Sequence, residues 1–297
     1  MEKAVCSKSD CFFLYIRMVD ELSMVDELSM VEKPMMIFLH GGGVSSWMWQ
    51  EHMEIFKETY ECYTPDFIGH GTRANETSFS MRESAFEIIS WIKEHAHGRT
   101  VILIGFSLGA QVAVDVLSRE PDIADIAIIN SALVLPLPWL YLMVRPILPL
   151  TYPLLKKDWF IQLQAEKMGL PNDVLDHYAA DSKQLQKKTL LTMFQENLHY
   201  KLPETFQQAK ARILVTVGEK EKSIMTRSAE KITNAHPNAA GFIVPDIGHT
   251  FTFEKKELFI NMIKSFIEER ALLAELKEIR KLGHLESEDE HKRGRHV

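Results

Sequence analysis

The segment that most constrains the fold is residues 100–120, "TVILIGFSLGAQVAVDVLSRE". Its first half is a continuous apolar run, which predicts a buried strand, and its second half predicts a helix that ends before Pro121. The turn between them, "GFSLG" at 105–109, leaves almost no room for side chains, and it has glycine on both sides of Ser107. A strand that passes directly into a helix is the repeating unit of a parallel α/β sheet.

The same pattern recurs along the chain. Short apolar runs that end at glycine, proline or polar residues alternate with segments of helical periodicity. We therefore predict an α/β fold with a mostly parallel, doubly wound sheet. The further strands are expected at 35–40, 61–67, 123–133, 212–218 and 240–246, and long amphipathic helices at 83–95 and 255–283.

One region interrupts this alternation. Residues 135–205 contain no good strand pattern and read as a helical cap inserted between two strands. The domain organisation predicted from this is a core of residues 1–134 and 206–283, the cap, and a charged tail at 284–297. The apolar stretch 133–155 has the length of a membrane span, but it holds five prolines and Arg145, so we expect a broken apolar surface over a pocket.

Composition excludes several classes of protein. A net charge of −7 argues against a nucleic-acid partner held by phosphate contacts. The sequence has three cysteines without metal-ligand spacing, and no phosphate loop or nucleotide motif, so no metal or cofactor is expected. The first residues lack the apolar core of a signal peptide, which favours a cytoplasmic location. The helix at 255–283 either covers the sheet or packs against a second subunit, so a homodimer stays open.

Ser107 and His249 are the candidates for nucleophilic chemistry. A serine in a G-x-S-x-G turn between strand and helix stands at the carboxyl end of the sheet, in the nucleophile-elbow arrangement. A serine hydroxyl needs a base to take its proton, and the base expected in this chain order is a histidine after a late strand. His249, in "VPDIGHTF" at 244–251, has that position, whereas His236 precedes a strand.

The oxyanion of an acyl-transfer reaction needs backbone N–H donors. Leu108, the residue after the serine, offers one. The second is expected from the glycine-rich loop "FLHGGGVSSW" at 38–47, where Gly42 is our choice and Gly41 and Gly43 are alternatives.

In order and approximate spacing, the motifs "HGGG", "PDFIGHG", "GFSLGA", "VGEKE" and "DIGHTF" resemble those of the α/β-hydrolase superfamily over about residues 35–265. The combination is specific for the superfamily and weak for any one activity. The resemblance implies that Asp66 and His70 are structural turn residues and that His40 orients the oxyanion loop.

The resemblance also suggests where the triad acid lies. The superfamily places it after a late strand, typically as G-x-x-D, and counting from Gly218 selects Glu221. A glutamate can orient the histidine as an aspartate does, provided that the loop retracts slightly. Glu219 and Asp246 remain alternatives.

The expected function is that of a serine hydrolase that cleaves a small apolar ester or related acyl compound through an acyl-enzyme. The alternatives are a C–C bond hydrolase, lyase or acyltransferase on the same fold, and a non-catalytic ligand-binding relative. The sequence does not name the substrate, because the pocket walls come from the insertion.

Overall fold

The computed structural model describes residues 32–76, 78–272 and 276–279. Within them lies a seven-stranded sheet with the order β2-β1-β3-β4-β5-β6-β7, which confirms the predicted mostly parallel α/β fold. Strands β1 to β6 are parallel, and only β7 runs antiparallel to its neighbour. The strands are β1 (Met35–Leu39), β2 (Glu61–Tyr63), β3 (Val101–Phe106), β4 (Ile126–Asn130), β5 (Arg212–Gly218), β6 (Ala239–Val244) and β7 (Lys277–Glu278).

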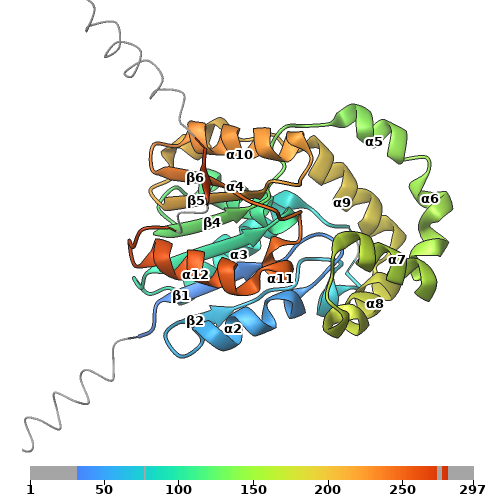
Figure 1. Ribbon diagram of the computed structural model, residues 1–297, viewed down its shortest axis with the longest axis horizontal. Helices are drawn as coiled ribbons and strands as arrows, with labels where there is room; N and C mark the ends of the chain where they lie inside the picture. The colour runs from blue at the N-terminus through green and yellow to red at the C-terminus, as the bar shows by residue number, and fades with distance from the viewer. Residues whose placement is uncertain (1–31, 77, 273–275, 280–297) are drawn as a thin grey trace, which may run out of the picture. The chain divides into compact units, whose positions relative to one another are not determined.

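Helices cover both faces of this sheet (Figure 1). Strand β1 shows how, since successive side chains point to opposite faces. Ile37 and its odd-numbered neighbours pack with the buried side of α3 and α4, whereas Phe38 packs with Trp49 and with Phe259 of α12. The helices of the core are η1 (Ser46–Trp49), α2 (Gln50–Phe56), η2 (Gly71–Arg73), α3 (Met81–His95), α4 (Leu108–Arg119), η5 (Glu204–Gln208), α10 (Ser223–Ala235), α11 (Phe251–Glu254) and α12 (Lys256–Ile267).

A group of short helices separates β4 from β5 in the chain. The side-chain amide of Gln111 in α4 donates to the carbonyls of Leu133 (2.6 Å) and Asn197 (3.2 Å), which ties both ends of this insertion to the core. None of the described helices is long and apolar enough to cross a membrane. The insertion comprises α5 (Pro138–Val144), α6 (Leu148–Thr151), η3 (Tyr152–Lys156), α7 (Asp158–Met168), η4 (Asn172–Val174), α8 (Leu175–Gln184) and α9 (Lys187–His199).

The prediction of one long helix at 255–283 is wrong. Helix α12 ends at Ile267, and Glu269 has a positive φ of 55°, which a helix cannot contain. The chain then returns as β7, and Ile279 packs into the core. β7 pairs with β6, whose edge would otherwise expose unpaired backbone N–H and C=O groups. The periodicity of apolar residues in the sequence does not reveal this pairing. The tail at 284–297 and residues 1–31 lie outside the described residues.

Candidate active site

Ser107 lies between β3 and α4 in a strained backbone conformation, with φ 53° and ψ −111°. The strand enters this turn so close to the helix that side chains are excluded on both sides. A Cβ at Gly105 would come within 2.6 Å of the Ala110 Cα, and one at Gly109 would overlap the Leu39 carbonyl. The two glycines therefore permit the turn that lifts the Ser107 hydroxyl out of the sheet.

The imidazole of His249 lies directly beside this hydroxyl. Its Nε2 is 2.9 Å from the Ser107 Oγ, although the two residues are 142 positions apart in the chain. His249 follows β6, and its side chain is 40% exposed. The ring of Phe106, the last residue of β3, packs 5.1 Å from the imidazole between centroids.

Glu221 holds the other side of this imidazole. Its Oε2 lies 2.6 Å from the His249 Nδ1, and its side chain is only 2% exposed. The Oε1 accepts hydrogen bonds from the Ser131 hydroxyl (2.6 Å) and the Gly218 amide (2.9 Å). Burial raises the pKa of Glu221, but these hydrogen bonds and that from His249 outweigh it, so the pKa lies below its usual value.

This arrangement sets the tautomer of His249. Because Glu221 is ionised and accepts, Nδ1 carries the proton. The lone pair of Nε2 is then free to accept the proton of the Ser107 hydroxyl. Serine, histidine and carboxylate form one continuous chain of hydrogen bonds with the polarity that base-assisted attack requires.

The two alternative acids point away from His249. Glu219 pairs with Lys277 and accepts from the Asp246 amide at 3.2 Å. The Asp246 carboxylate is exposed and lies 3.8 Å from the Lys220 Nζ. The structure thus brings Glu221, and neither alternative, to the histidine.

The glycine-rich loop after β1 lies beside the start of α4. A Cβ at Gly42 would sit 3.4 Å from the Leu108 Cδ2 and 2.9 Å from the Met193 Sδ of α9. Leu108 begins α4, and the first N–H groups of a helix have no carbonyl partner within it. The two expected oxyanion donors therefore belong to adjacent segments, with the insertion directly above them.

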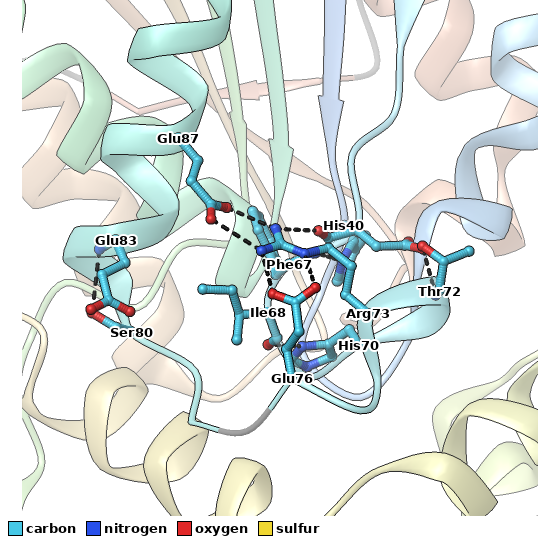
Figure 2. A network of polar contacts seen from close by, with 11 residues as sticks. His40, Phe67, Ile68, His70, Thr72, Arg73, Glu76, Ser80, Glu83 and Glu87 are labelled. Atoms are coloured by element: carbon cyan, nitrogen blue, oxygen red, sulfur yellow. Dashed lines mark hydrogen bonds and ion pairs between the residues drawn. The ribbon is translucent and has the colours of Figure 1, made fainter.

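His40 joins this loop to the turn after β2. Its Nε2 accepts from the Phe67 amide (3.0 Å), so the proton is on Nδ1, which donates to the Gly41 carbonyl (2.8 Å). Burial lowers the pKa of His40 to about 4, consistent with a neutral ring. Figure 2 shows His40 and the neighbouring His70, whose pKa burial lowers to about 3. Both histidines are part of the scaffold, as the resemblance implies.

Asp66 anchors the same turn. Its carboxylate accepts from the amides of Ser46 (2.7 Å) and Thr72 (2.8 Å), and Arg73 bridges Glu76 and Glu87 nearby (Figure 2). Burial raises the pKa of Asp66, but the hydrogen bonds outweigh it and lower the pKa overall. Asp66 therefore binds the backbone of the glycine-rich loop at Ser46 and that of its own turn at Thr72.

Ser131 is the site residue that sequence reasoning missed. It follows β4, is 2% exposed and adopts a positive φ of 55°. The only signal in the sequence is that Ser131 follows an apolar run, at the edge where the carboxyl ends of parallel strands meet. Among the described residues, no group of three or more His, Cys, Asp or Glu is arranged to hold a metal.

Comparisons with known proteins agree with this fold. The chain is 24% identical over 255 residues to the 2-hydroxy-6-oxo-6-(2'-aminophenyl)hexa-2,4-dienoic acid hydrolase of Metapseudomonas resinovorans, covering 80% of this chain and 84% of that protein. It is 22% identical to the 2-(acetamidomethylene)succinate hydrolase of Mesorhizobium japonicum, covering 79% and 88%. The solved structure of an esterase from Exiguobacterium antarcticum superposes with a TM-score of 0.68 at 17% identity, covering 80% and 92%.

A sequence model of the alpha/beta hydrolase family matches residues 36–261, which include strands β2 to β6, all of β1 but its first residue, and the whole insertion. The match spans most of the chain, and the parallel sheet with its tight turn at Ser107 has the architecture that the match requires. The chain therefore belongs to the alpha/beta hydrolase family.

Proposed function

We propose that this protein is a serine hydrolase that cleaves a small carboxylic ester or related acyl compound, with Ser107 as nucleophile, His249 as base and Glu221 as the acid. The observation that carries the proposal is the unbroken hydrogen-bond chain from Ser107 Oγ through His249 to the buried Glu221. Each member has the proton arrangement that its role needs.

The proposed reaction has two halves. The Ser107 oxygen bonds to the carbonyl carbon while its proton passes to the His249 Nε2, and the amides of Leu108 and Gly42 stabilise the oxyanion. Collapse breaks the ester C–O bond, and the imidazolium gives its proton to the leaving alcohol. A water molecule then attacks the acyl-enzyme, passes its proton to His249, and releases the acid as Ser107 regains its hydrogen.

An apolar acyl group fits the surroundings of the site best. Met193 of the insertion lies against the glycine loop, and Phe106 lies against His249. The insertion adds a small apolar cluster after β4, formed by Leu133, Tyr141 and Leu198. Pockets for acyl chains are mostly apolar with a few oriented polar groups.

The direct test is covalent labelling with a fluorophosphonate, which reacts with an activated serine. The wild-type chain is expected to be labelled and Ser107→Ala to stay unlabelled. Ser118→Ala, which removes a buried serine of α4 that bonds only to its own helix, serves as the matched control. Equal labelling of Ser107→Ala and the wild type would refute the nucleophile assignment.

The substrate class needs a second experiment, because the relatives include hydrolases of different printed substrates. Turnover of nitrophenyl esters across a series of acyl chain lengths supports the ester reading. Labelling without turnover of any ester would favour a C–C bond hydrolase, a lyase or an acyltransferase instead.

A further inference from the structure

The helical insertion exposes an unusual number of large apolar side chains. On α5, Trp139, Leu142 and Met143 are 59%, 66% and 61% exposed. Their spacing of i, i+3 and i+4 puts them on one side of the helix. The exposure continues beyond α5 through Ile147 and Leu150, the latter 79% exposed.

We call this surface the outer apolar face, formed by Trp139, Leu142, Met143, Ile147, Leu150 and Leu154. It is distinct from the side of the insertion that packs inward, where Tyr141 and Leu148 are buried. Figure 1 shows α5 and α6 along the outer edge of the insertion, away from the sheet. A helix in water normally presents polar residues on its outer side, so an apolar outer side indicates a partner.

Basic residues adjoin the outer apolar face. The Lys156 Nζ donates to the carbonyls of Lys183 (2.6 Å) and Leu185 (2.5 Å), which brings η3 against the end of α8. Arg145 is exposed between Met143 and Ile147, and Lys157 is exposed directly after Lys156. Residues 138–157 contain no acidic side chain, and Asp158, which follows them, is paired with Lys183 at 2.6 Å. This basic cluster contrasts with a net charge of −7 for the whole chain.

We propose that the outer apolar face docks on the surface of a lipid bilayer that contains anionic lipid. Trp and Leu side chains insert at the level of the headgroups, while adjacent lysines neutralise lipid phosphates, which is the combination that amphipathic membrane-surface helices use. A single apolar patch without the lysines would fit a second copy of the chain equally well. The basic residues favour the anionic surface, because a two-fold contact between copies through this face would bring the same basic residues of both copies together.

The docked insertion lies on the membrane rather than across it. Helix α5 has seven residues and α6 has four, far fewer than a span requires. Since the insertion also contacts the glycine loop at Gly42, a docked molecule would hold its candidate site close to molecules dissolved in the bilayer.

The test is co-sedimentation of the full-length chain with phosphatidylcholine vesicles, with and without phosphatidylglycerol. Anionic lipid is expected to raise the partition coefficient about tenfold or more. The double variant Leu142→Ser with Leu150→Ser should lose about tenfold in binding to the anionic vesicles. Its matched control is Ile55→Ser with Phe86→Ser, which replaces exposed apolar side chains of α2 and α3.

The charge is tested separately. Arg145→Glu with Lys157→Glu should remove the preference for phosphatidylglycerol, whereas Lys93→Glu with Lys210→Glu, equal in charge change but outside the insertion, should retain most of it. Light scattering of the free proteins is measured alongside, as is the unfolding temperature.

Three results would overturn the proposal: no binding to either vesicle, binding that the Leu142→Ser and Leu150→Ser changes leave intact, or a dimer of the wild type that those changes dissociate. The last would assign the face to a second copy of the chain. Turnover plays no part in the measurement, so its outcome is independent of the proposed hydrolase activity.

Discussion

Two regions at the carboxyl edge of the sheet hold a carboxylate and a histidine near each other, and in only one of them does the carboxylate hydrogen-bond the histidine. In the first, Glu221 holds His249 through Nδ1, and Nε2 faces a serine hydroxyl. In the second, Asp66 binds backbone amides, and both nitrogens of His40 bind the backbone. The difference teaches that a nearby carboxylate does not make a histidine a base. One ring nitrogen must also face a group that can give up its proton.

Removing the serine hydroxyl of the first region should cause the largest loss of kcat. Ser107→Ala is expected to lower kcat by roughly 10⁴-fold or more, because the remaining groups only bind and polarise the substrate. Steady-state turnover of a nitrophenyl ester measures the loss, with circular dichroism as the control for folding. Retention of more than a small fraction of the activity would mean that another nucleophile does the chemistry.

Removing the charge of the acid should have the next largest effect. Glu221→Gln is expected to lower kcat by roughly 10²- to 10⁴-fold, because an amide cannot stabilise the imidazolium and permits the wrong tautomer. Glu219→Gln, two residues away and paired with Lys277, is the matched control and should change kcat little. A reversal of the two results would contradict the assignment of the acid.

The histidines of the second region should affect the pH dependence of the free energy of unfolding instead of kcat. Burial lowers the pKa of His40 to about 4 and that of His70 to about 3, so between pH 6.5 and 4 the unfolded chain binds protons that the native chain does not bind. Stability is therefore full above pH 6.5 and falls as the pH drops through this window. We expect the free energy of unfolding to fall by about 2–5 kcal/mol between pH 7 and pH 5.

Urea titrations at the two pH values measure this change. His40→Gln removes one titrating ring and should reduce the pH slope, whereas His199→Gln, at an exposed position on α9, should leave the slope unchanged. A free energy of unfolding that stays constant from pH 7 to pH 5 would contradict the prediction.

The smallest expected effect is that of removing the Ser131 hydroxyl from the first region. Ser131→Ala removes one of the two hydrogen bonds to Glu221 Oε1 and leaves that of the Gly218 amide. We expect kcat to fall about tenfold or somewhat more, because one hydrogen bond to a charged group contributes about 1.5–3 kcal/mol. Alanine tolerates the positive φ no worse than serine, so the change isolates the hydroxyl. An unchanged kcat with lowered stability would limit Ser131 to a structural role.

The sequence by itself determined the succession of strands β1 to β6 along the chain and the place of Ser107. Continuous apolar runs between glycines predict buried strands without further information, since no other element buries both faces over so few residues. The turn at Ser107 was equally readable, because Gly105 and Gly109 are required by a close approach of strand and helix. The position of His249 followed from the order of the chain.

Only the tertiary structure decided which carboxylate faces His249. Glu219 and Glu221 lie in one turn, and their directions depend on contacts with a different segment: the Glu219 amide donates to the Val244 carbonyl and that of Lys220 to Ile247. Likewise β7 forms because the edge of β6 is open, and Ser131 meets Glu221 only across 90 residues of chain. Local sequence patterns reflect secondary-structure propensity and burial. The direction of Glu221, the pairing of β7 and the contact of Ser131 depend on residues distant in the chain, which only folding brings together.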